Sequence, residues 1–222
     1  PLMITINNNM YVLDTDNTSY AFAVLGSGQL EHLYYGRKLH ANEAVMTEKH
    51  TFIPGNTNVY NKDYSSYSLE DVCLEMSSLG KGDIREPFIE VTYPNGSSTT
   101  DMVFDRAEII QGKEEYDTLP GSYDDNGEVE QLVIYLKARN YNLTLELHYY
   151  VYEKCDIITR SAKLVNSGNE SVRLERLMSM QLDLNESDYE LSFFNGAWAR
   201  EMNRSRIPIR AGKYVNESVS GT

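Results

Sequence analysis

The sequence predicts an all-β protein, a large two-sheet antiparallel β-sandwich. Three observations predict it: apolar and polar residues alternate with a period of two, turn-forming residues separate the alternating stretches, and no run of about ten residues shows helical spacing. A strand with one apolar face has to bury that face against a second layer. All-β domains of about 200–250 residues are common as one unit, so we expect the 222 residues to form one sandwich.

Two stretches show the alternation most clearly. In residues 141–153, the side chains on the expected buried face are Leu143, Leu145, Leu147, Tyr149 and Val151. In residues 171–184, that face is expected to hold Val172, Leu174, Met178, Met180, Leu182 and Leu184, with Arg176 as the exception. Each stretch predicts a strand that is buried on one side.

Strings rich in Gly and Asn separate the expected strands, at residues 94–98, 124–128 and 166–170. Each string predicts a tight turn between antiparallel strands. Residues 48–68 are polar and contain Pro54 and Gly55, which predicts a long loop or hairpin region. Because long structured loops in compact domains tend to be functional, this segment is a candidate for binding.

The formal net charge of −13 restricts the possible partners. Nucleic acids and anionic membranes both attract Lys and Arg, so the charge argues against both, whereas a neutral sugar is compatible with it. No apolar run reaches the roughly 18 residues of a membrane span. No signal peptide precedes the first strand, so we expect a cytoplasmic protein. The opening P-L-M-I-T-I suggests that Met3 is the native initiator and that Pro1 and Leu2 lie outside the native protein.

Signals for metals and cofactors are weak. The four histidines lack the HxxxH and HExxH spacings, and Cys73 and Cys155 have neither a metal nor a redox spacing. The Gly-rich pieces at residues 26–28 and 80–83 match no phosphate-binding loop, and no Ser lies in a GxSxG string. We therefore expect no cofactor, no metal and no disulfide, and the residues alone lead only to an acidic β-sandwich.

Four spaced strings resemble one known family. They are G-Q-L-E-H-L-Y-Y-G-R-K-L at residues 28–39, S-L-E-D-V-C-L-E-M-S-S-L-G-K-G-D-I-R-E-P at 68–87, Y-E-K-C-D-I-I-T-R-S-A-K-L-V-N at 152–166 and F-N-G-A-W-A-R-E at 194–201. The last residues, S-V-S-G-T, are similar to the start of a further family string, although Ser220 stands where an Arg is common. In this order, the strings resemble those of the family 36 glycoside hydrolases, the bacterial α-galactosidases.

The resemblance implies that residues 3–222 form an N-terminal β-supersandwich domain that precedes a catalytic (β/α)8 barrel. It implies an α-galactosidase that acts on melibiose- or raffinose-type galactosides by a retaining mechanism, with both catalytic Asp residues on the barrel. It also implies a homo-oligomer, often a tetramer. No residue of this chain matches the catalytic pair, so we expect the chain alone to be inactive. A stand-alone carbohydrate-binding or assembly sandwich remains the alternative.

The resemblance also suggests residues that approach substrate. In relatives, a loop of this domain can approach the active-site mouth of a neighbouring subunit, and by position that loop is residues 52–61 here. Phe52 or Tyr60 can cover the apolar face of a sugar, and Asn56 or Asn58 can bond its hydroxyls. The alternative is an oligomer or surface loop that makes no sugar contact.

Five further motif residues are expected to be structural. Asp83 and Arg85 are expected to form an ion pair or a backbone-capping contact that holds a loop, rather than a second anchor near the sugar. Trp198, which stands beside small residues, is expected to be a wedge in the core or at a domain interface. Arg200 and Glu201 are expected to face the barrel.

Overall fold

A computed structural model describes residues 2–40, 59–60, 62–184 and 188–219. The chain divides into two compact units, Pro1–Asp183 and Leu184–Thr222. The helices among the described residues are three short 3-10 turns: η1 (Lys62–Tyr64), η2 (Leu69–Asp71) and η3 (Glu153–Cys155). No described helix is long and apolar enough to cross a bilayer.

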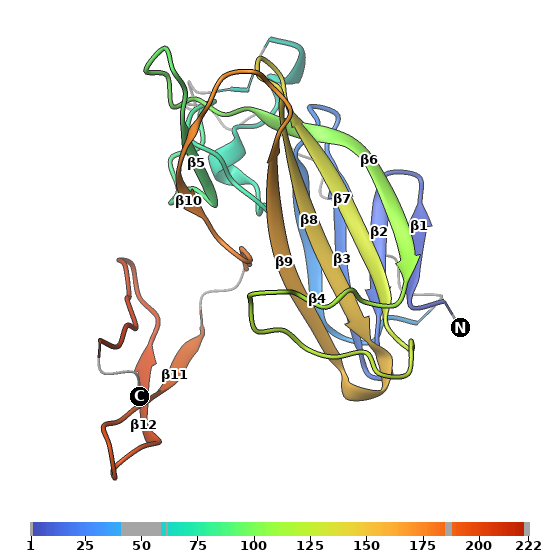
Figure 1. Ribbon diagram of the computed structural model, residues 1–222, viewed down its shortest axis with the longest axis vertical. Coiled ribbons are helices and arrows are strands. Elements are labelled where there is room, and N and C mark those ends of the chain that lie inside the picture. The colour runs from blue at the N-terminus through green and yellow to red at the C-terminus, as the bar shows by residue number, and fades with distance from the viewer. Residues whose placement is uncertain (1, 41–58, 61, 185–187, 220–222) are drawn as a thin grey trace. The chain divides into compact units, whose positions relative to one another are not determined.

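Two four-stranded antiparallel sheets form most of the first unit, and each runs in simple chain order. The first sheet contains β1 (Ile4–Asn7), β2 (Met10–Asp14), β3 (Thr18–Val24) and β4 (Leu30–Arg37). The second contains β6 (Met102–Gln111), β7 (Glu130–Ala138), β8 (Leu143–Tyr152) and β9 (Ile157–Asn166). Figure 1 shows the second sheet lying across the first.

One apolar core fills the space between these sheets. Phe22 of β3 stacks on Tyr149 of β8 with 5.3 Å between ring centroids, and both side chains are fully buried. The Ile4 amide at the start of the first sheet donates to Glu130 of β7 over 2.8 Å. The sequence-based prediction of an all-β, two-sheet sandwich is therefore confirmed.

The alternating stretch at residues 141–153 contains strand β8, Leu143–Tyr152, as predicted. Its five predicted core residues, Leu143, Leu145, Leu147, Tyr149 and Val151, are all buried. Strand β8 pairs with β7 on one side and with β9 on the other, so it is central in its sheet. A central strand is strongly constrained by burial, which explains why its sequence pattern is so clear.

The prediction for residues 171–184 is only partly right. The strand there, β10 (Arg173–Leu177), is short and pairs with β5 (Ile89–Thr92) in a two-stranded ribbon. The register shifts between Leu174 and Arg176. Of the residues predicted to share the buried face, Val172 and Leu182 pack against the core, whereas Leu174, Met178, Met180 and Leu184 are exposed. The strand ends at Leu177, so the alternation beyond it is not that of a paired strand.

The three turn strings do form turns, but two of them do not join paired strands. Residues 94–98 link β5 to β6, and residues 166–170 link β9 to β10, so both connect different sheets. The hairpins of the second sheet turn instead at residues 139–142 and 153–156. A short Gly-Asn string predicts that the chain reverses, but it does not say which strand the chain joins next.

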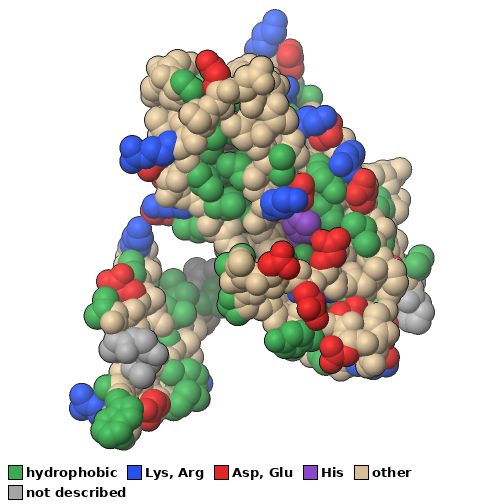
Figure 2. Space-filling model, viewed as in Figure 1, with side chains coloured by type: hydrophobic (Ala, Val, Ile, Leu, Met, Phe, Trp, Pro, Cys, Tyr) green, Lys and Arg blue, Asp and Glu red, His purple; other side chains and the backbone are tan. Residues whose placement is uncertain are grey.

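Residues 112–129 connect β6 to β7 and lie against the outer face of the second sheet. The Tyr116 hydroxyl is 2.9 Å from that of Tyr150, and Tyr152 donates to Ser122 over 2.6 Å. This connection contains six acidic residues: Glu114, Glu115, Asp117, Asp124, Asp125 and Glu128. Acidic side chains gather in the corresponding lower part of the face shown in Figure 2.

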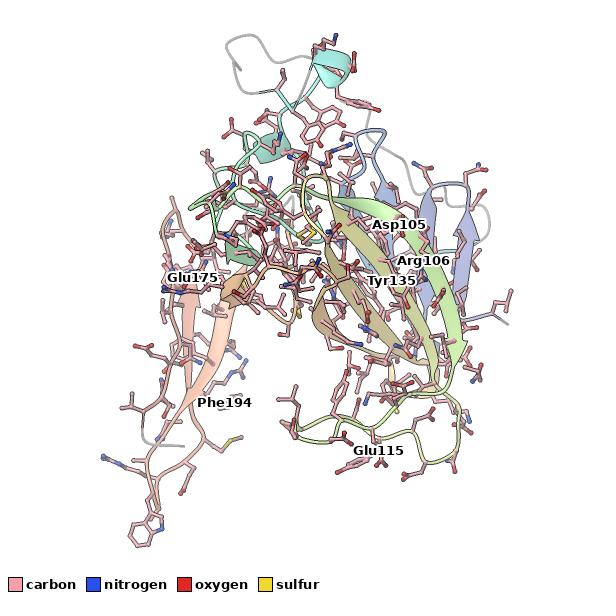
Figure 3. The ribbon with its side chains drawn as sticks, turned by 45° about the horizontal axis from the view of Figure 1, so that its top comes forward. Asp105, Arg106, Glu115, Tyr135, Glu175 and Phe194 are labelled. Atoms are coloured by element: carbon pink, nitrogen blue, oxygen red, sulfur yellow. The ribbon has the colours of Figure 1, made fainter. Side chains whose placement is uncertain are left out.

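The second unit is built on one antiparallel hairpin, β11 (Glu190–Asn195) and β12 (Asn203–Pro208). Many of its apolar side chains are exposed, including Phe194 on β11, which Figure 3 labels. A hairpin alone cannot bury a core, so an apolar surface of this kind requires another surface to cover it.

Candidate functional site

A buried polar cluster around one carboxylate lies between the two sheets, and three of the four motif strings supply side chains to it. Glu75 comes from residues 68–87, His32 from 28–39 and Arg160 from 152–166. Glu75 is fully buried. Its Oε1 lies 2.7 Å from His32 Nδ1, and its Oε2 lies 3.3 Å from Arg160 Nη2.

Two tyrosines complete the shell around Glu75. Tyr20 of β3 donates to Oε1 over 2.7 Å, and Tyr149 of β8 donates to Oε2 over 2.8 Å. Arg160 is held above the Tyr149 ring, 4.6 Å from its centroid. A buried carboxylate is tolerable only when its lone pairs and charge are satisfied, and here several donors from both sheets satisfy them.

The cluster keeps Glu75 ionised. Burial alone would raise its pKa, but the Arg160 guanidinium and the His32 hydrogen bond outweigh burial and lower the pKa of Glu75. Burial and the Glu75 charge raise the pKa of Tyr20 and Tyr149 well above the ordinary value, so both remain hydrogen-bond donors. A retaining glycosidase needs two carboxyl groups about 5–5.5 Å apart, whereas this cluster holds one carboxylate sealed from solvent. Its chemistry is suited to stabilising the fold.

The same cluster anchors the segment that ends the first unit. Arg160 Nη1 donates to the Gln181 carbonyl over 2.7 Å. The Gln181 side-chain carbonyl accepts bonds from the amide and the hydroxyl of Ser77, each over 2.9 Å. Residues from two motif strings therefore fix the path of the chain just before the boundary at Asp183.

Arg85 forms a second anchor at this boundary. Its Nε donates to Asp83 over 2.8 Å, and its Nη1 forms an ion pair with Asp183. Its Nη2 donates to the carbonyl of Val72 over 2.7 Å and also to that of Leu69. One guanidinium thus holds two loops and the segment that ends the first unit together. The structural role expected of Asp83 and Arg85 stays a prediction.

The candidate sugar-binding loop is described only at its end. Phe52, Asn56 and Asn58 lie outside the described residues. Tyr60 is 8% exposed, and its hydroxyl donates to Asp101 over 2.8 Å and accepts from Arg139 over 2.8 Å. This placement does not fit the expectation that Tyr60 stacks on a sugar, because its ring packs in a small apolar cluster.

The string F-N-G-A-W-A-R-E covers the end of β11 and most of the hairpin turn that leads to β12. A Cβ on Gly196 would lie 2.7 Å from the Cα of Glu201, so the turn requires glycine there. The Arg200 amide donates to the Ala197 carbonyl over 2.9 Å, and Glu201 accepts from the Ala199 amide over 2.8 Å. These bonds shape the turn.

Trp198 lies in this turn and is 89% exposed. The expectation of a wedge in the core is therefore wrong for the core of this chain. The other expectation, a wedge at a domain interface, stays a prediction. A large exposed indole is costly to leave in water, so it is suited to contact another surface.

Sequence reasoning missed the role of His32, Glu75 and Arg160, although all three lie inside the strings that carry the resemblance. A signal was present: a charged residue interrupts apolar or alternating stretches at Glu75 and Arg160. Their mutual contact was not predictable, because these residues are far apart along the chain.

Comparison with known proteins gives a consistent result. The family model described as the glycosyl hydrolase family 36 N-terminal domain matches residues 28–222. The bifunctional alpha-galactosidase/sucrose kinase AgaSK of Mediterraneibacter gnavus is 32% identical over 97% of this chain and 23% of its own length. Among solved structures, the GH36 alpha-galactosidase AgaB of Geobacillus stearothermophilus has a TM-score of 0.87 at 30% identity, over 95% of this chain and 29% of that one.

A second solved structure, a variant of alpha-galactosidase AgaA from Geobacillus stearothermophilus in complex with raffinose, has a TM-score of 0.85 at 31% identity. The match covers 91% of this chain and 28% of that one. This chain thus spans less than a third of the length of each of these relatives.

Proposed function

Since this chain belongs to the glycosyl hydrolase family 36 N-terminal domain family, we propose that it is the non-catalytic N-terminal part of an α-galactosidase. The complete protein hydrolyses terminal α-galactosides of the melibiose and raffinose type with retention of configuration. Its nucleophile and its acid/base Asp lie on a following barrel. The observation that carries the proposal is that nearly the whole chain matches proteins named alpha-galactosidase, while the match covers less than a third of the length of each of them.

The domain's role in this proposal is that of a scaffold for the rest of the protein. The anchors at Gln181 and Asp183 support this role, because they fix the end of the sandwich. The exposed Trp198 supports a contact between the hairpin and the barrel. We further propose that the complete protein is a homo-oligomer, in which residues 52–61 approach the active site of a neighbouring subunit.

The stereochemistry of the reaction tests the proposal. The complete protein should release galactose from a nitrophenyl α-galactoside, and proton NMR at early times should show the α-anomer first, because two displacements restore the configuration. Release of the β-anomer first would contradict the retaining mechanism. Activity on other glycosides but on no α-galactoside would contradict the substrate assignment.

A further inference from the structure

Three connections of the first unit meet beside the ring of Tyr141. They are the turn after β5, the β7–β8 turn and the β9–β10 connection, and they line one hollow of about 300 Å³. Figure 1 shows the β7–β8 turn and the β9–β10 connection at the same end of the second sheet. This volume is at the low end of the range for small-molecule sites.

Tyr141 forms a fixed aromatic surface in this hollow. Its ring stacks on that of Tyr93 with 3.4 Å between centroids and 8° between planes. Tyr93 is 2% exposed and lies in the core, whereas Tyr141 is only half-buried. One face of Tyr141 is thus backed by the core while the ring retains solvent exposure, which is the arrangement that stacking against an apolar sugar face requires.

Exposed side-chain amides surround this ring. Asn140, Asn142 and Asn169 line the hollow, and within the described residues none of their side-chain amides forms a hydrogen bond to protein. Asn166 differs, because its amide donates to the Glu170 carbonyl and accepts from the Gly168 amide, each over 2.9 Å. A free amide group can donate to one hydroxyl and accept from the next, which suits the vicinal hydroxyls of a sugar.

The charge of the hollow selects among ligands. Glu170 lines it, and no Lys, Arg or His is among its described lining residues. A phosphate or another anion therefore has no cation to bind there, whereas a carboxylate accepts bonds from hydroxyls readily. A second hollow of about 450 Å³ shares the Asn140–Leu143 turn and is lined also by Lys137 and Arg139, which form ion pairs with Asp105 and Asp101. The lack of lining cations therefore holds for the first hollow alone.

We propose that Tyr141, with Asn140, Asn142 and Asn169, forms a binding site for a neutral oligosaccharide at this end of the sandwich. The site stacks one pyranose on Tyr141 and bonds its hydroxyls with the three amides. It rests on the geometry of the first unit alone, so it does not depend on the proposed hydrolase function.

An NMR titration of the ¹⁵N-labelled 222-residue chain with raffinose tests the site. We expect shifts concentrated at residues 93–96, 139–143 and 166–172, with a dissociation constant on the order of millimolar, since the hollow is open and shallow. Tyr141→Phe should bind as the parent does, because it keeps the ring. Tyr141→Ala should weaken binding about tenfold.

Asn140→Ala is a second test variant in case Tyr141→Ala disturbs the packing of the sandwich. The Asn140 side chain is exposed and makes no described hydrogen bond to protein, so its removal should leave the fold unchanged. Asn140→Ala should weaken binding severalfold, whereas Asn126→Ala, an exposed asparagine in another turn, should leave binding unchanged. No shifts in these segments at about 100 mM raffinose, or equal binding by all variants, would overturn the proposal. Binding of galacturonate as strong as that of galactose would overturn the assignment to neutral sugars.

Discussion

Arg160 on β9 forms a buried ion pair with Glu75, with 3.3 Å between Nη2 and Oε2. The guanidinium also bonds the Gln181 carbonyl over 2.7 Å. One side chain thus links the centre of the sandwich to the segment where the first unit ends. The stability of the sandwich and the path of the chain at its end therefore depend on the same side chain.

Removal of one partner from this pair should be strongly destabilising. Glu75→Ala leaves Arg160 buried without its counter-charge, and we expect a loss of about 3–5 kcal/mol in the free energy of unfolding, measured by urea denaturation. Glu175→Ala is the matched control, because Glu175 forms an exposed pair with Arg173 and should cost about 1 kcal/mol or less. Equal losses for the two variants would show that burial of the cluster is unimportant.

The lowered pKa of Glu75 predicts a pH dependence with a definite sign. A carboxyl whose pKa is lower in the folded state than in the unfolded state binds fewer protons when folded, so its stabilisation is present above the unfolded pKa. It is lost as the pH falls through the folded pKa, below about 4.5. The difference in unfolding free energy between parent and Glu75→Gln should therefore shrink as the pH is lowered from about 6 to 3. A difference that grows on acidification would contradict this sign.

Asp183→Ala should loosen the segment that ends the first unit without unfolding the sandwich. Asp183 accepts the Leu74 amide over 2.8 Å and forms an ion pair with Arg85. Without that acceptor, the Leu74 amide should exchange with solvent about tenfold faster in a hydrogen-exchange experiment. Amides in the centre of β8 serve as the internal control and should be unaffected.

Gly196→Ala and Ala199→Gly should act in opposite directions on the hairpin of the second unit. The first places a Cβ 2.7 Å from the Glu201 backbone, whereas Ala199 already has a positive φ of 62°, which glycine adopts more easily. Hydrogen exchange of the β11–β12 amides should accelerate in Gly196→Ala and slow slightly in Ala199→Gly. The turn geometry would be contradicted if Gly196→Ala left exchange unchanged.

The proposed approach of residues 52–61 to a neighbouring active site predicts a kinetic change in the complete protein. Phe52→Ala, Asn56→Ala and Asn58→Ala should raise KM severalfold with little change in kcat, because a contact made equally in the ground state and the transition state changes binding alone. Tyr123→Ala removes an aromatic side chain that is 72% exposed and should change neither constant. Unchanged KM in all three loop variants would favour a loop that makes no sugar contact.

The central strands were predictable, whereas a bulged strand was not. Strand β8 is buried on its inner face over its whole length, so its period of two is unbroken. Strand β10 is short and irregular, with a register shift between Leu174 and Arg176, and it ends at Leu177, so the alternation placed Met178 and Met180 in a core that they do not enter. The sequence carries no clear signal for that shift.

The candidate cluster was less predictable than the fold, because it depends on long-range contacts. Glu75 and His32 are 43 residues apart, and Arg160 bonds Tyr20 over a separation of 140 residues. Local patterns do not reveal such pairs. Trp198 shows the same limit, because small neighbours in sequence do not reveal which surface its ring covers.

The contact between Arg106 and the ring of Tyr135 shows that a cation–π pair in this fold does not by itself indicate a binding site. The Arg106 guanidinium lies 3.5 Å from the ring centroid of Tyr135, and Figure 3 shows the two residues together on β6 and β7. The pair lies on an exposed strand surface and forms further bonds with Glu108. We therefore expect Arg106→Ala to change stability by only about 0.5–1 kcal/mol in urea denaturation. A loss as large as that of Glu75→Ala would contradict this ranking.

The proposal that this chain is the non-catalytic part of an α-galactosidase is tested by assaying the isolated 222 residues. We expect a circular dichroism spectrum typical of β-structure and no measurable turnover of nitrophenyl α-galactoside, while the complete protein hydrolyses the same substrate. The proposal would be wrong if the isolated chain showed turnover that survives purification to homogeneity and disappears when one of its own carboxylates is replaced.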